Sequence, residues 1–274
     1  MSKAQRKTAG GVALNQIIET MLSHRSVRKY TGEVPTDEQI QLIVRAGQQA
    51  AFAAQLYSIL LSRKTKHAFG APLMFTICVD FHKMQQVMTK RDWQPISNDL
   101  SILLMGMQDA AYMTQNMILA AESMGIGSCL LGSAPYRAKQ VAEQYSLPPK
   151  VFPMVQLVMG YPDEQRPPRP RYPLEFVLFE DKYPEMSDEL VERAMRVMDE
   201  GYLAQDYYHR MNAKIKITQD RQDTSTYEDY SWCEHMCRKW GQWHESIDEI
   251  LQQLGACGFD LAPGPNAKRY TPDT

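Results

Sequence analysis

The sequence of 274 residues lacks any long apolar run and any excess of charge of one sign. No stretch approaches the roughly 18 apolar residues that a membrane-spanning helix needs, so no membrane partner is expected. The formal net charge of −2 leaves no basic excess to neutralise a phosphate backbone, so no nucleic-acid partner is expected. Polar residues 1–11 lead into an amphipathic stretch at 12–23, which is not typical of a signal peptide. These absences predict a globular, cytoplasmic protein.

Cysteine is scarce and irregularly spaced. Five cysteines in 274 residues favour reduced thiols over a disulfide framework. Cys233, His235 and Cys237 suggest metal ligands, but structural zinc sites use closely spaced ligand pairs with turns between them, so no metal is expected. A dinucleotide fingerprint is also missing, because Gly125 and Gly127 follow a helical pattern instead of opening one.

Apolar periodicity predicts helices and short strands in alternation. A helical pattern covers residues 12–23, 105–124 and 136–145, and another begins near Thr36 with a capping signal. Short apolar runs predict strands at residues 56–61, 73–79, 128–131 and 154–159. Strands separated by helices indicate a layered α+β or α/β domain.

The pattern changes from Tyr183 onwards. Helices rich in Tyr, Trp and charge are expected at 186–205 and 227–255, with a polar stretch between them and a loosely ordered tail after them. We therefore divide the chain into a flexible N-terminus at 1–11, a main domain at 12–182, a helical extension at 183–258 and a tail at 259–274.

Two arginine clusters are the most informative motifs. Residues 24–30 read His-Arg-Ser-Val-Arg-Lys-Tyr, and residues 169–173 read Arg-Pro-Arg-Tyr-Pro. A guanidinium group presents a planar fork of donors that binds phosphate bidentately, and a serine hydroxyl adds a directional bond. The alternative is that these arginines are solvated surface charges.

With the segments between these clusters, the chain resembles the flavin-dependent nitroreductase family. The matching residues are the 24–30 motif, Ala50–Gln55, the long helical segment Asp109–Gly127, Gly160 and the 169–173 motif. Their order is similar to the larger, NADPH-preferring branch, whose members carry a helical C-terminal extension. The resemblance implies a three-layer α+β fold with a mostly antiparallel central sheet. It also implies an intertwined homodimer that binds FMN across its interface and uses NADPH or NADH.

The resemblance also implies roles for single residues. It places the FMN phosphate on Arg25, Ser26 and Arg171, with Arg169 as a further candidate. Arg28 is the cation expected beside the flavin edge that gains negative charge on reduction. The full set of expected FMN contacts is His24, Arg25, Ser26, Arg28, Ala50, Ala51, Phe52, Gln55, Leu131, Gly132, Ser133, Arg169 and Arg171.

The segment after the second helix departs from the family's usual pattern. Many members place serines or an asparagine where this chain has Ala50, Ala51 and Ala53. Side-chain contacts to the flavin are therefore expected to be fewer, with Gln55 and backbone groups of the alanines and Phe52 supplying them.

Two further contacts are expected around the flavin. The 62–71 segment is short for the family, so Lys66 or His67 is the candidate to replace a contact that a helix there often provides. After the long helix, Gly132 lets the backbone approach the flavin ring, where an N–H could bond N5. An ordinary turn glycine is the alternative at that position.

The basic segment at 209–216 is the expected contact for the 2′-phosphate of NADPH. Arg210 is the first candidate and Lys214 the second. The alternative is a solvated helix end, where cations meet the C-terminal dipole favourably.

Together these features predict an FMN-dependent enzyme that reduces nitroaromatics, quinones or flavins with hydride from NAD(P)H in a ping-pong mechanism. No protein residue has to act as nucleophile or metal ligand. The alternatives are a dedicated ene-type reductase or dehalogenase with incidental nitro reduction, and a non-enzymatic flavin store or redox partner. The long helix is apolar around most of its surface, which predicts that a second subunit covers part of it.

Overall fold

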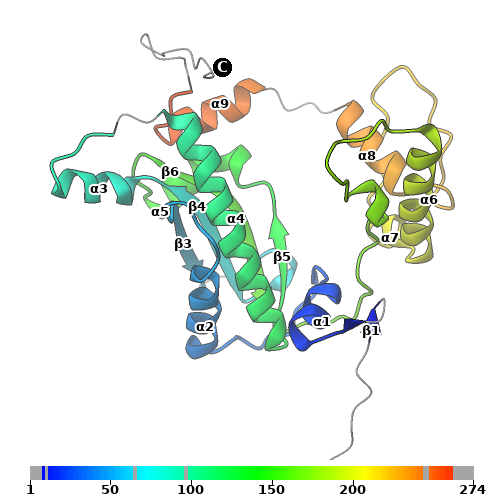
Figure 1. Ribbon diagram of the computed structural model, residues 1–274, viewed down its shortest axis with the longest axis horizontal. Coiled ribbons are helices and arrows are strands. Elements are labelled where there is room, and N and C mark those ends of the chain that lie inside the picture. Colours follow the sequence, from blue (N-terminus) through cyan, green and yellow to red (C-terminus); the bar gives the residue numbers. More distant parts are fainter. Residues whose placement is uncertain (1–7, 10–11, 64–66, 96–97, 243–246, 262–274) are drawn as a thin grey trace, which may run out of the picture. The chain divides into compact units, whose positions relative to one another are not determined.

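The computed structural model describes residues 8–9, 12–63, 67–95, 98–242 and 247–261 (Figure 1). Contacts within the chain divide it into two compact units. The first runs to Arg166 and resumes at Ser246, and the second spans Pro167–Glu245. None of the described helices is long and apolar enough to cross a membrane.

A four-stranded antiparallel sheet forms the centre of the first unit. Its order is β3-β4-β6-β5, so chain neighbours β5 and β6 lie side by side at one end. The strands are β3 (Tyr57–Ser62), β4 (Leu73–Asp80), β5 (Gly127–Leu131) and β6 (Val151–Gly160). A separate two-stranded ribbon pairs β1 (Thr8–Ala9) with β2 (Val12–Ala13). These strands and the helices around them confirm the α+β fold class.

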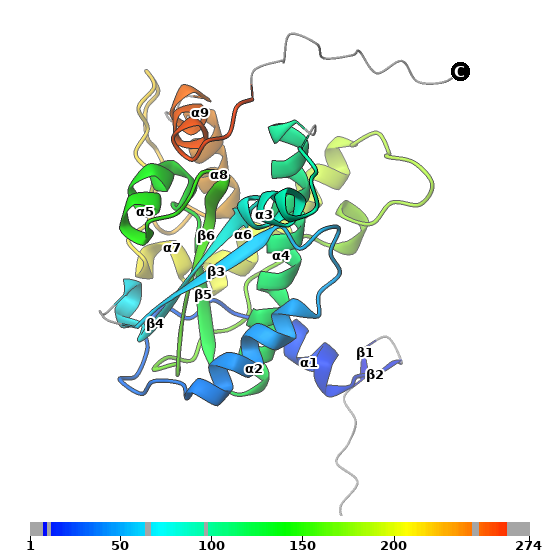
Figure 2. The same cartoon turned by 90° about the vertical axis from the view of Figure 1, so that its left-hand side faces the viewer.

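Helices lie on both sides of this sheet. Figure 2 shows α4 on one side and α5 on the other. The α2 helix packs beside α4, and α9 packs against α5. The helices of this unit are α1 (Gln16–Leu22), α2 (Asp37–Gln48), α3 (His82–Lys90), α4 (Asp99–Ser123), α5 (Ala138–Tyr145) and α9 (Ile247–Ala256). Short 3-10 helices are η1 (Ala68–Gly70) and η2 (Pro135–Arg137).

The core of this unit depends on close contact between α2 and α4. A Cβ at Gly47 would lie 2.6 Å from Met117 Cγ and 3.1 Å from the Met113 carbonyl oxygen. The absence of a side chain at residue 47 therefore lets the two helices approach. Met113 and Met117 are fully buried there with the apolar side chains of β4 and β6.

The second unit is helical and rich in aromatic side chains. Its elements are η3 (Leu174–Phe176), α6 (Asp188–Ala204), α7 (Tyr207–Arg210) and α8 (Trp232–Gly241). Buried Tyr208 stacks on His235 with ring centroids 4.5 Å apart and meets Tyr230 edge-on at 5.5 Å. Arg238 is only 5% exposed and donates to both carboxylate oxygens of Asp223, at 2.9 and 2.8 Å.

Several helix boundaries differ from the sequence prediction. Residues 12–13 are strand, and α1 begins at Gln16, where the Asn15 side chain accepts a hydrogen bond from the Ile18 amide at 3.0 Å. The expected single helix at 227–255 is wrong. It is divided into α8 and α9, because the backbone of Gln242 leaves the helical region with φ −138°. The α3 and α7 helices were not expected.

Candidate functional site

The first arginine motif lies along the edge of the sheet next to β5. The Val27 amide donates to the Ser128 carbonyl at 2.8 Å, and Ser26 forms a parallel bridge with Ser128. Tyr30 forms an antiparallel bridge with Pro162, and its buried hydroxyl donates to the Val27 carbonyl at 2.7 Å. Strand-like pairing therefore fixes the backbone that carries the motif's polar side chains.

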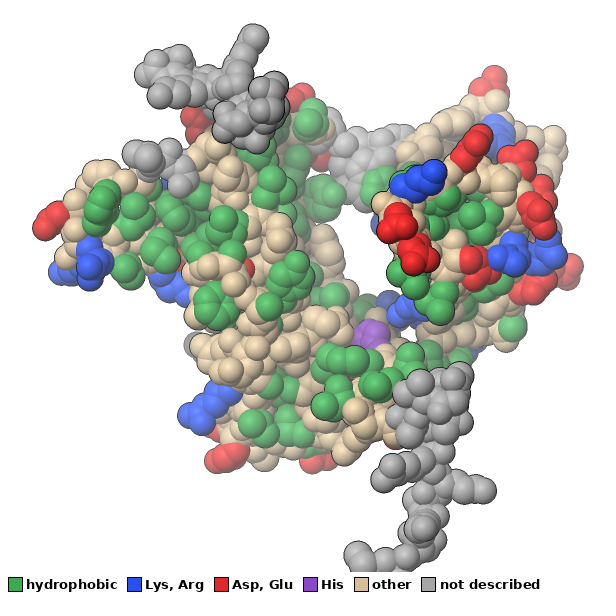
Figure 3. Space-filling view, viewed as in Figure 1, with side chains coloured by type: hydrophobic (Ala, Val, Ile, Leu, Met, Phe, Trp, Pro, Cys, Tyr) green, Lys and Arg blue, Asp and Glu red, His purple; other side chains and the backbone are tan. Residues whose placement is uncertain are grey.

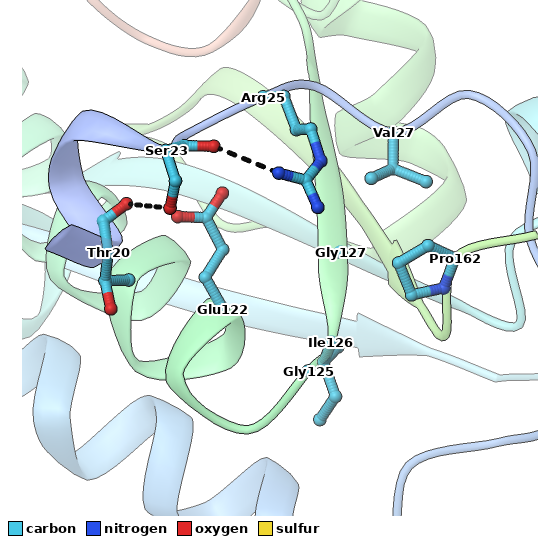
Figure 4. Close-up of a pocket in the computed structure, with 9 residues that line it drawn as sticks. All are labelled: Thr20, Ser23, Arg25, Val27, Glu122, Gly125, Ile126, Gly127 and Pro162. Atoms are coloured by element: carbon cyan, nitrogen blue, oxygen red, sulfur yellow. Dashed lines mark hydrogen bonds between the residues drawn. The ribbon is translucent and has the colours of Figure 1, made fainter. Parts of the chain in front are cut away.

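Arg25 stands over a cavity of about 140 Å³ whose lining residues come from α1, the end of α4 and β5 (Figure 4). Its Nη1 donates to the Ser23 carbonyl at 3.3 Å, a long bond that uses one of its five N–H groups. A cavity of this size holds a phosphate group or several waters. Arg25 therefore has further donors beside this cavity, and its binding of the FMN phosphate stays a prediction.

Glu122, which the sequence analysis did not assign to the site, lines the same cavity. Its Oε1 lies 2.6 Å from His24 Nδ1, and its Oε2 is buried without a hydrogen-bond partner. A carboxylate beside Arg25 opposes anion binding in this cavity. The signal in the sequence is that Glu122 is the one acidic residue between Asp109 and Gly127 in a long apolar helix.

The backbone of Arg28 is fixed by a hydrogen bond, but one nitrogen of its guanidinium group has no partner. Its amide donates to Glu164 Oε1 at 2.6 Å, and its Cζ lies 6.0 Å from the centroid of the Phe69 ring. Its Nη1 is buried and has no hydrogen-bond partner. Since an unpaired buried donor costs about 1–3 kcal/mol, this atom marks a place where an acceptor would bind favourably.

Glu164 is the fixed anion beside Arg28. Burial opposes its ionisation, but hydrogen bonds from the Arg28 amide and from Arg166, with the charges of both arginines, hold its pKa below the usual range. The Glu164 carboxylate is therefore ionised near neutral pH. It anchors the motif's backbone, while the Arg28 guanidinium extends toward Phe69.

The loop between α2 and β3 presents the expected flavin contacts at the surface. Ala51, Phe52 and Gln55 are exposed, and Ala50 is half-buried. Gln55 has a left-handed backbone with φ 53°, which is uncommon for a residue with a side chain. The loop's polar backbone groups and the Gln55 amide are thus accessible to a ligand.

Leu131 is the last residue of β5, and Gly132 and Ser133 follow it directly. A Cβ at Gly132 would meet no atom within 4 Å, and its φ lies outside the left-handed region. Gly132 lies in a turn after β5, and its close approach to the flavin stays a prediction. The hydroxyl of Ser133 accepts a bond from Arg137 at 3.0 Å.

The 62–71 segment shows no side chain that is free to make the expected flavin contact among its described residues. Lys66 lies outside the described residues. Nε2 of His67 lies 3.1 Å from the Ser62 carbonyl oxygen, so this ring is already engaged within its own segment.

The second arginine motif belongs to the second unit. Nη1 of exposed Arg171 donates to the carbonyls of Arg169 and Pro170, both at 3.1 Å. The guanidinium carbon of Arg169 lies 3.5 Å from the centroid of the Tyr207 ring, a close cation–π contact. A shared phosphate site of Arg171 with Arg25 stays a prediction.

The two nucleotide candidates differ in their contacts. Arg210 is exposed and donates from Nε to the Asp206 carbonyl at 3.2 Å. Nζ of Lys214 lies 3.1 Å from Asp223 Oδ2 and also donates to the Ser225 carbonyl. Lys214 is thus engaged by groups of its own unit while Arg210 is exposed, and both nucleotide contacts stay predictions.

The cysteines and His235 of α8 have other partners. Nδ1 of His235 lies 3.0 Å from the Tyr230 hydroxyl, and Cys233 Sγ donates to the Met195 carbonyl at 3.8 Å. Within the described ranges, no group of three or more His, Cys, Asp or Glu side chains could hold a metal ion.

The fold and these residues can be compared with known proteins. Residues 62–161 match the model of the nitroreductase family. The NADPH-flavin oxidoreductase of Vibrio harveyi is 31% identical over 189 residues, which are 64% of this chain and 77% of that protein. The FMN reductase (NADPH) of Bacillus subtilis is 29% identical over 223 residues, which are 75% of this chain and 88% of that protein.

A solved structure extends the similarity to most of the chain. The NADPH:FMN oxidoreductase of Vibrio harveyi complexed with NAD+ covers 89% of this chain and 99% of its own, with a TM-score of 0.69 at 26% identity. The family model and the identity over most of the Vibrio harveyi enzyme's length show that this chain belongs to the nitroreductase family.

Proposed function

We propose that this protein is an FMN-dependent oxidoreductase that takes hydride from NADPH or NADH and reduces nitroaromatics, quinones or flavins. Family membership supports the reaction class, and the relatives carry names of NADPH-dependent flavin reductases and nitroreductases. The observation in this chain that carries the proposal is the buried Nη1 of Arg28, which has no acceptor of its own.

The donors on the first unit fit the polar groups of FMN. A phosphate dianion needs charged donors, and Arg25 and Ser26 lie next to each other at the edge of β5. The isoalloxazine edge carries acceptors that suit Arg28 Nη1 and the exposed amide of Gln55.

The protein's residues bind and orient the cofactor and set its charge environment. Bound FMN would supply the hydride chemistry, accepting two electrons from a nicotinamide and donating them to an acceptor. Arg25, Ser26 and His24 would hold the phosphate end. Arg28 would place a permanent positive charge beside the edge that becomes negative on reduction, which raises the reduction potential.

Removing one phosphate contact tests the proposal. Arg25→Ala should weaken FMN affinity about 10- to 100-fold, because a charge-assisted hydrogen bond contributes roughly 1.5–3 kcal/mol. The dissociation constant is measured by quenching of flavin fluorescence on the apoprotein. Arg45→Ala, on the exposed face of α2, is the matched control and should leave the constant unchanged.

Two results would contradict this assignment. One is release of FAD instead of FMN from the purified protein. The other is equal FMN affinity in Arg25→Ala and the unmodified protein. Oxidation of NADPH with and without a nitroaromatic or quinone then distinguishes a reductase from a flavin store, because only a reductase turns over repeatedly when the acceptor is added.

We also propose that the protein is a homodimer. Apolar side chains remain exposed on α4, among them Leu104 at 56% and Tyr112 at 50%, and on α1, where Ile17 is 65% exposed. A groove of about 500 Å³ is lined by residues of α1, α2 and α4. Figure 3 shows hydrophobic side chains gathered over α4 and α1 on this face. A second copy covering the face would remove this surface from water.

A cytoplasmic location is proposed as well. None of the five cysteines, all within the described residues, forms a disulfide. Reduced thiols are typical of a reducing compartment.

A further inference from the structure

The Ala50–Gln55 loop has few backbone hydrogen bonds to keep its shape. Gln55 is held at a left-handed φ of 53°, a conformation that persists only where the surroundings determine it. The amides of Ala53, Ala54 and Leu56 do not enter a helix or strand ladder. All three donate instead to one side chain.

That side chain is Asp109 of α4, which is only 1% exposed. Its Oδ1 accepts from the Ala53 amide at 2.6 Å. Its Oδ2 accepts from the Ala54 amide at 3.1 Å and from the Leu56 amide at 3.0 Å. Hydrogen bonds to a buried carboxylate are charge-assisted and stronger than those between neutral groups. One buried group therefore satisfies three backbone donors of a loop that is distant in sequence.

One turn before Asp109, a glycine of α4 allows the loop to approach the helix closely. A Cβ at Gly106 would lie 2.5 Å from Val79 Cγ1 and 3.3 Å from the Leu56 carbonyl oxygen. Gly106 thus lets α4 lie close to the start of β3. Since residues three apart share a helix face, the close approach at Gly106 brings the Asp109 carboxylate within reach of the loop amides.

We propose that Asp109 is a positioning residue, which holds the Ala50–Gln55 loop in the conformation that receives FMN. It acts through the loop backbone and touches neither cofactor nor substrate. The inference rests on the proposed function, since the exposed backbone and the Gln55 amide are the groups that meet the flavin. A loop that is already ordered before binding loses little conformational entropy when FMN binds. The affinity of the protein for FMN is therefore higher.

The test compares two isosteric changes on the same helix. Asp109→Asn keeps the shape but replaces one acceptor oxygen by an amide group that faces backbone donors. Asp99→Asn is the matched control, because Asp99 is also buried on α4 and accepts from the Asp260 amide and Lys150 Nζ, at 2.5 and 2.6 Å. Both changes should lower the Tm of the apoprotein.

Only Asp109→Asn should change cofactor binding. We expect its FMN dissociation constant, from fluorescence quenching, to rise about tenfold or more, and that of Asp99→Asn to change less than about twofold. The visible absorption bands of the bound flavin should shift in Asp109→Asn alone. Hydrogen exchange of the Ala53, Ala54 and Leu56 amides should become faster in the same variant.

Each remaining outcome has a defined meaning. If Gln55→Ala weakens FMN binding but Asp109→Asn does not, the positioning role is overturned and the proposed function stands. If the unmodified protein binds no FMN, both are overturned. If Asp109→Asn does not fold, hydrogen exchange of the Ala53, Ala54 and Leu56 amides in the unmodified apoprotein tests the positioning role instead. Slow exchange supports the role, and exchange at the rate of unprotected amides overturns it.

Discussion

Arginine side chains in this chain differ in how many of their donors the fold itself uses. Arg238 is fully engaged by Asp223, Glu234 and the Ile215 carbonyl. Arg28 keeps a buried Nη1 without an acceptor. An engaged guanidinium stabilises the fold, whereas a buried donor without a partner costs free energy until an acceptor reaches it.

Arg210, the proposed nucleotide contact, is an exposed arginine with donors that the fold does not use. Arg210→Ala should raise the Michaelis constant for NADPH about fivefold and leave that for NADH nearly unchanged, since an exposed charge contact contributes roughly 1 kcal/mol. Steady-state kinetics with each nucleotide measures both constants. Arg196→Ala, at an exposed position of α6, serves as the control.

The opposite outcomes are also informative for Arg210. Equal losses with NADPH and NADH would assign the side chain a structural role. Equal use of both nucleotides by the unmodified protein would remove the reason to expect a 2′-phosphate contact.

At the scale of elements, helix ends were predicted more closely than helix starts, because the expected ends at 124 and 145 lie within one residue of the ends of α4 and α5. Thr36 begins α2 with a reciprocal capping box to Gln39, as expected from the sequence. The α4 helix begins six residues before the expected Met105, at Asp99, because the Asn98 side chain caps it by accepting the Ser101 amide at 2.7 Å. Both caps consist of residues three apart, so a sequence reading can find them. The break at Gln242 has no such local signal.

A charge network ties the segment before α8 to that helix. Hydrogen bonds from Arg238 and, after it, from Lys214 hold the pKa of Asp223 well below its ordinary value of 3.8, although desolvation acts in the opposite direction. Because the folded-state pKa is lowered, the stabilisation is fully present above pH 3.8 and is lost as the pH falls through the folded-state pKa.

Asp223→Asn should therefore lower the Tm at pH 7 and make the fall in Tm below pH 4 less steep than in the unmodified protein. Thermal unfolding between pH 7 and pH 2.5 measures both effects. Asp220→Asn, an exposed neighbour in the same segment, should leave the profile unchanged. Parallel profiles for Asp223→Asn and the unmodified protein would refute the role of the network.

At the scale of the whole molecule, the sequence predicted the fold class and the family, but only some of the site. The two arginine motifs are far apart in the chain and fall in different compact units. Their roles came from the resemblance, because residue spacing does not determine how distant segments meet. Glu122 and the loop contacts of Asp109 were missed for the same reason, since their partners lie 98 and 53–56 residues away.

The proposed dimer is tested with a charge on its exposed apolar face. Leu104→Glu should shift the protein toward monomer and reduce FMN retention, because a buried unpaired carboxylate is costly in an interface. Light scattering at micromolar concentration measures the mass. Gln108→Glu adds the same charge at another exposed position of α4 and shows whether charge alone separates the subunits. A flavin-loaded monomer of the unmodified protein would exclude the dimer.

The chain leaves the first compact unit at Arg166 and rejoins it at Ser246. Both ends of the second unit are thus joined to the same folded body, so during evolution this stretch could be exchanged as a cassette without interrupting the sheet. The cassette contains the proposed nucleotide contact Arg210, whereas the Ala50–Gln55 loop and the 24–30 motif lie outside it. Preference for NADPH or NADH could therefore change during evolution while the proposed FMN contacts of the first unit stay the same.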